Sequence, residues 1–284
     1  MKNRGKIYGV IGDPIEHSVS PAMFNAVFRE AGLWDSIYTA IRVASNELQQ
    51  LVRAIRLLPF GGINVTIPHK VSIMRYLDLL DESAEEVGAV NTVHVAGEEL
   101  VGYNTDMLAV MRVLKQFKRA GDGAVVLGCG GAARAAAIAL RELSINKQTF
   151  VGRSRKRMRE MKRFTASRGI DAEIISFQDS KLNSVLEKSS VIINATPVGM
   201  YPNVKSTPIY SSLIPRGAVV FDMVYNPEET MLLRAAKRRG ARIIGGLEML
   251  VTQAEEAYRI WFGSRAPRDI MMRAARNELR RFKK

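Results

Sequence analysis

The sequence predicts an α/β protein of two domains, each built on a mainly parallel sheet. Short β-branched runs alternate with longer stretches of helical periodicity along the 284 residues. A glycine-rich loop at residues 128–133 lies between an apolar run and an alanine-rich stretch, which is the context of a strand–loop–helix unit. Apolar residues make up 47% of the chain, so sizeable cores can be buried.

The first 70 residues predict parallel strands separated by helices. Residues 46–58 have the apolar spacing of an amphipathic helix. Ser20 and Pro21 suit the start of another helix, since serine is a common N-cap and proline fits the first turn, and Gly32 suits its end. Pro68 predicts one more helix directly after the last strand. The expected strands cover residues 6–12, 36–43 and 61–66.

The middle of the chain predicts a hairpin and then a domain boundary. Residues 89–103 hold two alternating runs that turn at Gly97-Glu98. A helix is expected from Asp106 to about Arg119, and the segment 121–123 breaks the pattern. We place the boundary near residue 105.

A second α/β unit begins after this break, and the chain then returns to the first domain. Helical patterns cover residues 134–143 and 249–263, and a basic helix ends the chain. The predicted domains are 1–105, 106–246 and 247–284, the last being helices that pack back on the first domain. The expected strands of this unit cover residues 124–128, 148–152, 191–196, 218–223 and 241–246.

The formal net charge of +14 is the unusual bulk property of the chain. Much of it lies in residues 152–168 and in the C-terminal stretch from Arg268 onward. A solvated surface is the usual role of such runs, and binding of anions or nucleic acid is the alternative. The chain has no zinc-finger pattern, basic-region zipper or aromatic–glycine RNA-binding signature, which argues against a nucleic-acid partner.

Other bulk features exclude several classes of protein. No run of about 18 uncharged apolar residues indicates a membrane span. The start, MKNRGKIYGVIGDP, has only a short apolar stretch, unlike a secretory signal. Cys129 is the only cysteine, which excludes an internal disulfide, and the three histidines lack metal-ligand spacing. We therefore predict a cytoplasmic protein without a metal.

The glycine-rich loop fits the dinucleotide fingerprint G-x-G-x-x-G/A. Glycines let the backbone approach a diphosphate closely, and the N-terminus of the following helix favours its charge. A glycine turn without a ligand is the alternative, but the strand before the loop and the helix after it favour nucleotide binding. The predicted cofactor-binding residues of the loop are Gly128, Gly130, Gly131, Ala132 and Ala133.

The next predicted strand ends in Gly152-Arg153-Ser154, where no acidic residue is present. An NAD site usually has Asp or Glu about 20 residues beyond the glycine loop, to hold the ribose hydroxyls. Arginine suits the 2′-phosphate of NADP instead, because its planar guanidinium pairs with phosphate through two hydrogen bonds. Arg153, Ser154 and Arg157 lie within one short loop, so we predict that they bind NADP.

Lys70 is the residue that we expect to exchange the proton of the substrate. It would lie in the first turn of the helix opened by Pro68, at the end where the helix dipole disfavours a cation. Partial burial would lower the pKa of this lysine further, towards the range in which it exchanges protons. A surface lysine is the alternative. Asn64 and Thr66, on one face of the preceding strand end, favour the functional role.

Three further polar residues are candidates for the same site. Ser18 and Ser20 are two residues apart, so in an extended segment both hydroxyls would point the same way, towards a carboxylate or another oxyanion. Asp106 lies at the hinge between the halves, where it could bind a substrate hydroxyl and orient Lys70. For Ser20 and Asp106 the alternative is a helix cap. The residues alone thus predict an NADP-dependent dehydrogenase for a small anionic alcohol.

The chain resembles the shikimate dehydrogenase family over nearly its whole length. The motifs that carry the resemblance occur in the same order as in the family: Ser18-x-Ser20-Pro21, NVTIPHK (64–70), GAVNT (88–92), GYNTD (102–106), GCGGAAR (128–134), NATPVGM (194–200), DMVYNP (222–227) and GGLEMLVTQ (245–253). The resemblance implies reversible reduction of 3-dehydroshikimate to shikimate by NADPH, a step of chorismate and aromatic amino-acid biosynthesis. It implies an N-terminal α/β substrate domain and a Rossmann domain for NADP.

The resemblance also implies a role for individual residues. Lys70 and Asp106 would form the catalytic dyad, and Ser18 and Ser20 would hold the substrate carboxylate. The residues that would bind or cover the remainder of the substrate are Thr66, Asn91, Tyr225 and Gln253. On the cofactor side, Thr196, the backbone of Met223 and Gly246 would contact NADP. The motif that usually reads Asn-Arg-Thr in the family is Gly152-Arg153-Ser154 here.

Other functions remain open on the sequence alone. A quinate dehydrogenase with relaxed cofactor use and a methylene-tetrahydrofolate type of dehydrogenase are the nearest alternatives. A catalytically silent nucleotide sensor and a nucleic-acid binder are alternatives of another class. Gln253 and the paired serines favour a small polyol acid over a folate, and the Lys70–Asp106 pair disfavours a silent sensor. The oligomeric state, a homodimer included, is left open.

Overall fold

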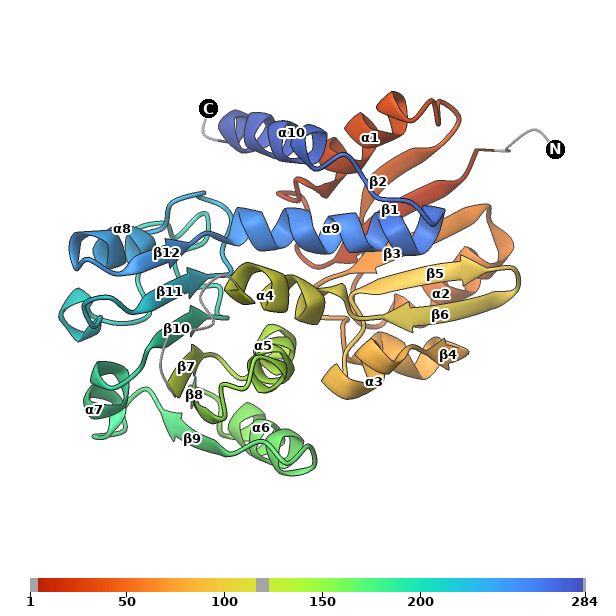
Figure 1. Cartoon of the computed structure of the whole chain (residues 1–284). Helices are drawn as coiled ribbons and strands as arrows, with labels where there is room; N and C mark the ends of the chain where they lie inside the picture. The colour runs from red at the N-terminus through yellow and green to blue at the C-terminus, as the bar shows by residue number, and fades with distance from the viewer. Residues whose placement is uncertain (1–4, 116–122, 283–284) are drawn as a thin grey trace. The chain divides into compact units, whose positions relative to one another are not determined.

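The computed structural model describes residues 5–115 and 123–282, which form two compact units (Figure 1). The first unit comprises residues 1–105 and 251–284, and the second comprises residues 106–250. Each unit contains its own six-stranded sheet. The helix end expected near Arg119 and the break at residues 121 and 122 lie outside the described residues.

The sheet of the first unit has the strand order β2-β1-β3-β5-β6-β4. Its first three strands are parallel, β5 runs antiparallel to β3, and β6 pairs antiparallel with β5 in the expected hairpin. The hairpin turns at Gly97, whose φ of 70° suits glycine. The strands are β1 (Ile7–Gly12), β2 (Ile37–Arg42), β3 (Phe60–Val65), β4 (Leu79–Leu80), β5 (Thr92–Ala96) and β6 (Glu99–Tyr103).

Two helices of this unit match the prediction closely. Helix α1 (Ser20–Glu30) is followed by Gly32 at a φ of 68°, and α2 (Leu48–Leu57) buries Leu48, Val52 and Ile55. The spacing of those three residues is the apolar stripe that periodicity predicted. Helix α3 (Glu82–Val87) and strand β4 were not predicted, because both are short and carry little periodic signal.

The helix expected to open at Pro68 does not form. Residues 67–71 make turns, and only a short 3₁₀ helix, η1 (Ser72–Tyr76), follows. The Thr66 carbonyl accepts from the His69 N–H at 2.9 Å, so Pro68, which has no N–H to donate, is the third residue of a turn and does not start a helix. The prediction that a helix dipole acts on Lys70 is therefore wrong.

The C-terminal segment supplies two helices to the fold. Helix α9 (Gly246–Phe262) begins in the second unit and ends in the first, and α10 (Arg268–Arg281) packs against α1 (Figure 1). Trp261 of α9 lies directly over β3, since a Cβ added to Gly62 would be 2.2 Å from its Nε1. The Trp261 indole donates to the Val93 carbonyl at 3.0 Å. Gly62 therefore provides the space that docks α9 on the first sheet.

The second unit has the Rossmann topology. Its strands are all parallel, in the order β12-β11-β10-β7-β8-β9, so the order reverses between β7 and β10. The strands are β7 (Gly123–Leu127), β8 (Lys147–Gly152), β9 (Ala172–Ser176), β10 (Val191–Asn194), β11 (Val219–Asp222) and β12 (Arg242–Ile244). The prediction missed β9, in which a glutamate interrupts the apolar run.

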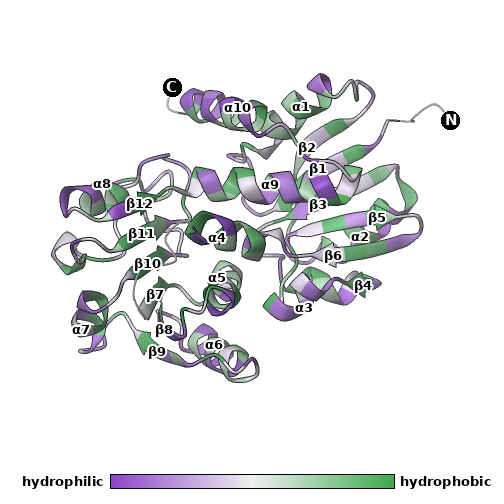
Figure 2. Cartoon of the chain, in the orientation of Figure 1, coloured by the Kyte–Doolittle hydropathy of each residue, from purple (hydrophilic) through white to green (hydrophobic). Residues whose placement is uncertain are grey.

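Helices and strands of the second unit enclose one apolar core. Its members include Val125, Val151, Ile192 and Leu232, and β10 and β11 carry the hydrophobic colour in Figure 2 while α8 carries both colours. This contrast reflects strands buried on both faces and a helix buried on one. The helices are α4 (Thr105–Lys115), which begins at the unit boundary, α5 (Gly131–Glu142), α6 (Arg155–Ala166), α7 (Leu182–Glu187), the 3₁₀ helix η2 (Ser211–Leu213) and α8 (Met231–Arg238).

Candidate active site

One edge of the first sheet collects the predicted substrate residues. Strands β1, β2 and β3 are parallel and end in register at this edge. Because β5 is antiparallel to β3 and β6 is antiparallel to β5, the start of β5 and the end of β6 lie there too. The segments at this edge carry Ser18, Ser20, Thr66, Lys70 and Asn91. The segment that follows β6 there leads to Thr105, the residue directly before Asp106.

Lys70 lies in the turn after β3, held there by its backbone. Its carbonyl accepts from the Val90 N–H at 2.7 Å, and its side chain is half-buried. Thr66, also half-buried, lies against Gly12, where an added Cβ would be 2.5 Å from the Thr66 Cγ2 atom. The glycine at the end of β1 thus lets Thr66 pack closely against that strand.

The two serines are arranged differently from the prediction. Helix α1 begins at Ser20 itself, and the preceding Val19 already has helical dihedral angles, so the segment is not extended. The Ser20 hydroxyl does not cap the helix, since no side-chain capping hydrogen bond is found at its N-terminus. Instead the Ser18 Oγ accepts from the Ser20 N–H at 3.3 Å. The serines therefore neighbour each other through a local turn.

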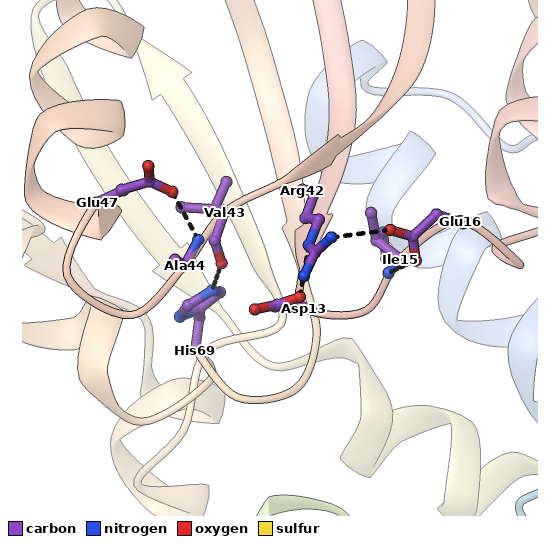
Figure 3. A network of polar contacts seen from close by, with 8 residues as sticks. All are labelled: Asp13, Ile15, Glu16, Arg42, Val43, Ala44, Glu47 and His69. Atoms are coloured by element: carbon purple, nitrogen blue, oxygen red, sulfur yellow. Dashed lines mark hydrogen bonds and ion pairs between the residues drawn. The ribbon is translucent and has the colours of Figure 1, made fainter.

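A polar network ties together the loops that follow β1, β2 and β3 (Figure 3). The Arg42 guanidinium lies 2.8 Å from Asp13 and 3.8 Å from Glu16, both in the loop that leads to Ser18. The buried His69 ring places Nε2 2.7 Å from the Val43 carbonyl. His69 therefore anchors the turn that also carries Lys70.

A buried chain of hydrogen bonds links Asn91 to helix α9. Asn91 Oδ1 accepts from the Thr105 N–H at 2.7 Å, and its Nδ2 donates to the Thr105 hydroxyl at 2.9 Å. The same hydroxyl lies 3.4 Å from Gln253 Oε1. Asn91 and Gln253, 162 positions apart, thus meet through Thr105, the residue before Asp106.

A second branch of this chain involves residues that sequence analysis missed or left without a role. The Tyr38 hydroxyl donates to Asn64 Oδ1 at 2.7 Å, and Asn64 Nδ2 donates to the Thr92 hydroxyl at 3.0 Å. All three side chains are buried. Asn64 belongs to the NVTIPHK motif that the sequence analysis recognised. Tyr38 is an ordinary residue of a predicted strand, so no local sequence pattern indicated its role.

Asp106 is buried and lies within the first turn of α4, which begins at Thr105. The helix therefore starts before Asp106, which leaves the carboxylate in the turn and not at the N-cap position. Asp106 is the first residue of the second unit, whereas Lys70 belongs to the first. The predicted cofactor residues and the predicted substrate residue Tyr225 also belong to the second unit.

The glycine loop of the second unit has the geometry of a phosphate cradle. Gly128 has a φ of 120°, which other residues rarely adopt, and an added Cβ there would be 3.0 Å from the Ala195 carbonyl oxygen. Around Gly130, no atom lies within 4 Å of an added Cβ. Helix α5 begins at Gly131 with no acidic residue in its first turn, and the buried Ala133 permits close packing on the sheet. The loop residue Cys129 is buried, which raises the pKa of its thiol to about 11 despite Arg157 nearby.

The basic residues after β8 surround the start of α6. Ser154 is the N-cap, and its hydroxyl accepts from the Arg157 N–H. Arg153, Ser154 and Arg157 are exposed, so their polar groups are accessible beside a helix N-terminus. Gly152 has no space for a side chain, because an added Cβ would be 2.5 Å from Met158 Cγ and 2.9 Å from Cys129 Sγ.

Beyond β10 and β11 lies a buried polar cluster of Asn194, Asp222 and Thr230. Asn194 Nδ2 donates to Asp222 Oδ1 at 2.9 Å, and the Thr230 hydroxyl donates to Asp222 Oδ2 at 2.6 Å. Burial raises the pKa of Asp222 to about 6, against the hydrogen bonds that lower it. Thr196 belongs to the same cluster, since its hydroxyl donates to Asn194 Oδ1 at 2.6 Å. Asn194 and Asp222 begin the motifs NATPVGM and DMVYNP, but the sequence alone assigned neither residue a role.

Met223 and Gly246, both predicted to contact NADP, lie against each other in the second unit. A Cβ added to Gly246 would be 2.5 Å from the carbonyl oxygens of both Met223 and Val224. Only glycine fits there, so the start of α9 lies against the backbone that follows β11. Burial raises the pKa of Tyr225 to about 12, which keeps its phenol protonated and able to donate.

Two searches of the described residues bear on the site. Within residues 5–115 and 123–282, no group of three or more His, Cys, Asp or Glu side chains could hold a metal ion. None of the helices in the described part of the chain is long and apolar enough to cross a membrane.

Comparisons with known proteins give a consistent result. Residues 10–93 match the family model of the shikimate dehydrogenase substrate binding domain, and residues 246–276 match that of the shikimate 5′-dehydrogenase C-terminal domain. The shikimate dehydrogenase (NADP⁺) of Symbiobacterium thermophilum is 41% identical over 276 residues, which cover 95% of this chain and 94% of that protein.

Solved structures agree with the sequence matches. The Thermus thermophilus shikimate 5-dehydrogenase in complex with NADP(H) and shikimate has a TM-score of 0.84 and 32% identity, with 96% of this chain and 99% of that chain covered. The quinate dehydrogenase of Corynebacterium glutamicum in complex with NAD has a TM-score of 0.87 and 28% identity, with 97% and 100% covered.

Proposed function

The chain belongs to the shikimate dehydrogenase family, and from that premise we propose that Lys70 and Asp106 are its catalytic residues. As a member of the family it is an NADP-dependent oxidoreductase that acts on a CH–OH group. The reaction is the reversible reduction of 3-dehydroshikimate to shikimate, a step of chorismate and aromatic amino-acid biosynthesis. The proposal concerns which of its own side chains do this work.

The second unit fits NADP at two places. The diphosphate would lie on the backbone at Gly128, Gly130, Gly131, Ala132 and Ala133, where the open space around Gly130 and the acid-free start of α5 suit two negative charges. Arg153, Ser154 and Arg157 would hold the 2′-phosphate. Thr196, Met223 and Gly246 would contact the nicotinamide half. When bound, NADPH supplies the hydride for the keto carbon.

Lys70 supplies the proton that balances this hydride. In the direction of reduction, the Lys70 ammonium gives a proton to the substrate oxygen as the carbonyl becomes a hydroxyl. In the reverse direction, the neutral amine takes that proton back. Asp106, whose carboxylate can accept from both a substrate hydroxyl and an ammonium, orients the two groups. The Val90–Lys70 hydrogen bond holds the backbone of Lys70, and the Asn91–Thr105 hydrogen bond holds the backbone of Thr105, the residue before Asp106.

The remaining predicted residues bind the substrate. Ser18 and Ser20 supply hydroxyl donors for its carboxylate, beside the N-terminus of α1. Thr66, Asn91 and Gln253 bind its hydroxyls, and Tyr225 donates from its protonated phenol. The observation that carries the proposal is the common sheet edge from which Ser18, Ser20, Thr66, Lys70 and Asn91 all leave.

An assay of NADPH formation tests the proposal. Shikimate or quinate is offered with NADP or NAD, and Lys70→Ala is measured beside Lys6→Ala, a matched change at an exposed lysine of the same unit. We expect turnover with shikimate and NADP, and a loss of roughly 10²–10⁴-fold in kcat for Lys70→Ala with unchanged NADPH binding. No turnover with any pair contradicts the function, and full activity of Lys70→Ala contradicts only the mechanism.

Two finer points are also proposals. The similarity to a quinate dehydrogenase makes quinate the second substrate to test. We place the enzyme in the cytoplasm as a homodimer with a small-molecule substrate. A free, buried Cys129 suits a reducing compartment. Sedimentation at several protein concentrations checks the dimer, and a single monomeric species would contradict it.

A further inference from the structure

Thr196 follows β10 and lies beside the glycine loop. A Cβ added to Gly128 would be 3.3 Å from the Thr196 Cγ2 atom and 3.0 Å from the Ala195 carbonyl oxygen. The Thr196 methyl group thus covers the first glycine of the loop. Its hydroxyl is engaged in a network whose donors and acceptors can be assigned one by one.

The orientation of the Asn194 amide is determined by backbone groups on both sides. Its Nδ2 donates to the Val198 carbonyl at 3.2 Å, and a carbonyl can only accept. Its Oδ1 accepts from the Thr196 N–H at 3.1 Å, and an N–H can only donate. A flipped amide would therefore place oxygen against oxygen and nitrogen against nitrogen. Asn194 is fully buried, so water does not compensate for such a flip.

Asp222 fixes the same polarity from the other side. Its Oδ1 accepts from Asn194 Nδ2 at 2.9 Å and from the Val224 N–H at 3.0 Å. Because a backbone N–H donates to this oxygen, the oxygen facing Asn194 is an acceptor in either protonation state of the carboxyl group. Asp222 is fully buried, and its Oδ2 accepts from Thr230, the N-cap of α8. The cluster thus joins β10, β11 and α8.

With these assignments, the Thr196 hydroxyl can interact with a ligand only as a hydrogen-bond acceptor. Its single hydrogen is donated to Asn194 Oδ1 at 2.6 Å, and one lone pair accepts from the Val198 N–H at 3.2 Å. The second lone pair can accept one more hydrogen bond. A phosphate oxygen has no hydrogen to give, so it is not a partner for this group. The partner of Thr196 is a donor.

We propose that the Thr196 hydroxyl recognises a hydrogen-bond donor on the nicotinamide half of the cofactor, and that Asn194 and Asp222 are positioning residues that fix its polarity. This rests on the proposed NADP site. The half is assigned by topology: a dinucleotide lies across the point where the strand order reverses, here between β7 and β10. The 2′-phosphate residues follow β8, on one side of that point, and Thr196 follows β10, on the other. The donor is a ribose hydroxyl or the carboxamide N–H.

Direct binding of NADPH to the full chain tests the proposal without using turnover. The variants are Thr196→Val, which removes the hydroxyl at nearly equal volume, and Thr196→Ser, which keeps it. Thr207→Val is the control, since Thr207 is an exposed threonine of the same unit whose hydroxyl donates to the Ile209 carbonyl. We expect Thr196→Val to weaken NADPH binding about fivefold to tenfold, as for one neutral hydrogen bond, and the other two to bind like the parent.

Two probes locate the donor. The fragment 2′,5′-ADP lacks the nicotinamide half, so we expect all three variants to bind it like the parent. The 3-acetylpyridine analogue of NADPH replaces the carboxamide NH₂ by a methyl group. If the penalty of Thr196→Val disappears with this analogue, the donor is the carboxamide, and if the penalty persists, the donor is a ribose hydroxyl. Both results support the proposal.

The positioning role is tested at Asp222. Asp222→Asn keeps an oxygen that can accept from Asn194 and Val224, so we expect parental NADPH binding. Asp222→Ala removes that acceptor, and we expect the penalty of Thr196→Val, with no further loss when the two changes are combined. Additive penalties overturn the positioning role.

Equal NADPH affinity of parent and Thr196→Val overturns the donor proposal, as does an equal loss for 2′,5′-ADP. If Asp222→Ala does not fold, the NADPH affinities of Asp222→Asn, Thr196→Val and Thr196→Ser still test the proposal. A parent that binds NADPH with this pattern and does not oxidise shikimate contradicts the proposed function alone.

Discussion

Arg153 and Arg157 are two among many exposed arginines, and their surroundings are the reason for the cofactor-binding role proposed for them. Arg153 directly precedes Ser154, the N-cap of α6, and Arg157 donates its backbone N–H to the Ser154 hydroxyl, so both arginines lie at the N-terminus of this helix. Arg159 and Arg163, further along the same helix, lack that terminus. The pattern of charge in the sequence is the same for both pairs.

We expect Arg153→Leu to raise the KM for NADPH about 10- to 100-fold, because a charge-assisted, bidentate phosphate contact is lost. The KM for NADH, which has no 2′-phosphate, should stay unchanged. Steady-state kinetics with both cofactors measure the two values. Arg159→Leu is the matched control for net charge, and an equal effect of both variants would show that only long-range charge matters.

For Lys70 the structural reason given by the sequence was wrong, and its catalytic role stays a proposal. The sequence pointed to it through a helix dipole, but a turn and a 3₁₀ helix follow Pro68. What holds Lys70 is the bond from the Val90 N–H to its carbonyl and the buried neighbour His69. Val90 and Val43, whose carbonyl holds the His69 ring, lie on other segments, so no local pattern could have shown these contacts.

At the scale of helices and strands, the contact of α9 with β3 docks the C-terminal segment on the first sheet. The Trp261 ring fills the space left by Gly62 and also contacts Tyr8 and Phe24 at ring-centroid distances of 5.1 and 5.3 Å. Periodicity predicted both elements and the resemblance implied the return of the C-terminal helices. The partner glycine was not predictable, because a strand glycine has several possible causes.

Trp261→Ala should lower the free energy of unfolding by about 3–5 kcal/mol, through lost burial, a cavity and an unpaired Val93 carbonyl. Denaturant unfolding followed by circular dichroism measures this loss. Trp34→Ala is the control, since Trp34 is 73% exposed and its removal should change the free energy by less than about 0.5 kcal/mol. Similar losses for both would contradict the docking role of Trp261.

The free energy of unfolding of the whole molecule should depend on pH through the titration of Asp222. Burial raises its pKa from 3.8 to about 6, so the folded state holds the proton more tightly than the unfolded state. The stabilising contribution of the protonated form is complete below pH 3.8 and is lost as the pH rises through about 6. Asn at this position does not titrate.

The free energy of unfolding of Asp222→Asn, minus that of the parent, should therefore increase between pH 4 and pH 7. A shift of about two pKa units corresponds to an increase of up to about 3 kcal/mol. Denaturant titrations of both proteins at several pH values measure this difference, and other titrating groups cancel in it. A difference in the free energy of unfolding that stays constant with pH would contradict the raised pKa of Asp222 in the folded state.

The amino-acid sequence by itself determined most elements and the Rossmann glycine loop, and it named the arginines proposed to bind the cofactor. These depend on neighbouring residues, whose spacing sets helix or strand periodicity and whose glycines permit close backbone approach. Elements of five or six residues, such as β9 and α3, carry too little of that periodicity to be recognised.

Only the tertiary structure decided which distant residues share hydrogen bonds. Tyr38 of β2 meets Asn64 of β3 although β1 lies between the two strands, and Asn194 of β10 meets Asp222 of the neighbouring β11. The members of these pairs are 26 and 28 residues apart. Such pairs depend on strand order and register, which arise from the packing of the whole unit. For that reason the sequence could name Thr196 as a candidate cofactor residue, while only the structure shows that its hydroxyl donates to Asn194 and accepts from the Val198 N–H.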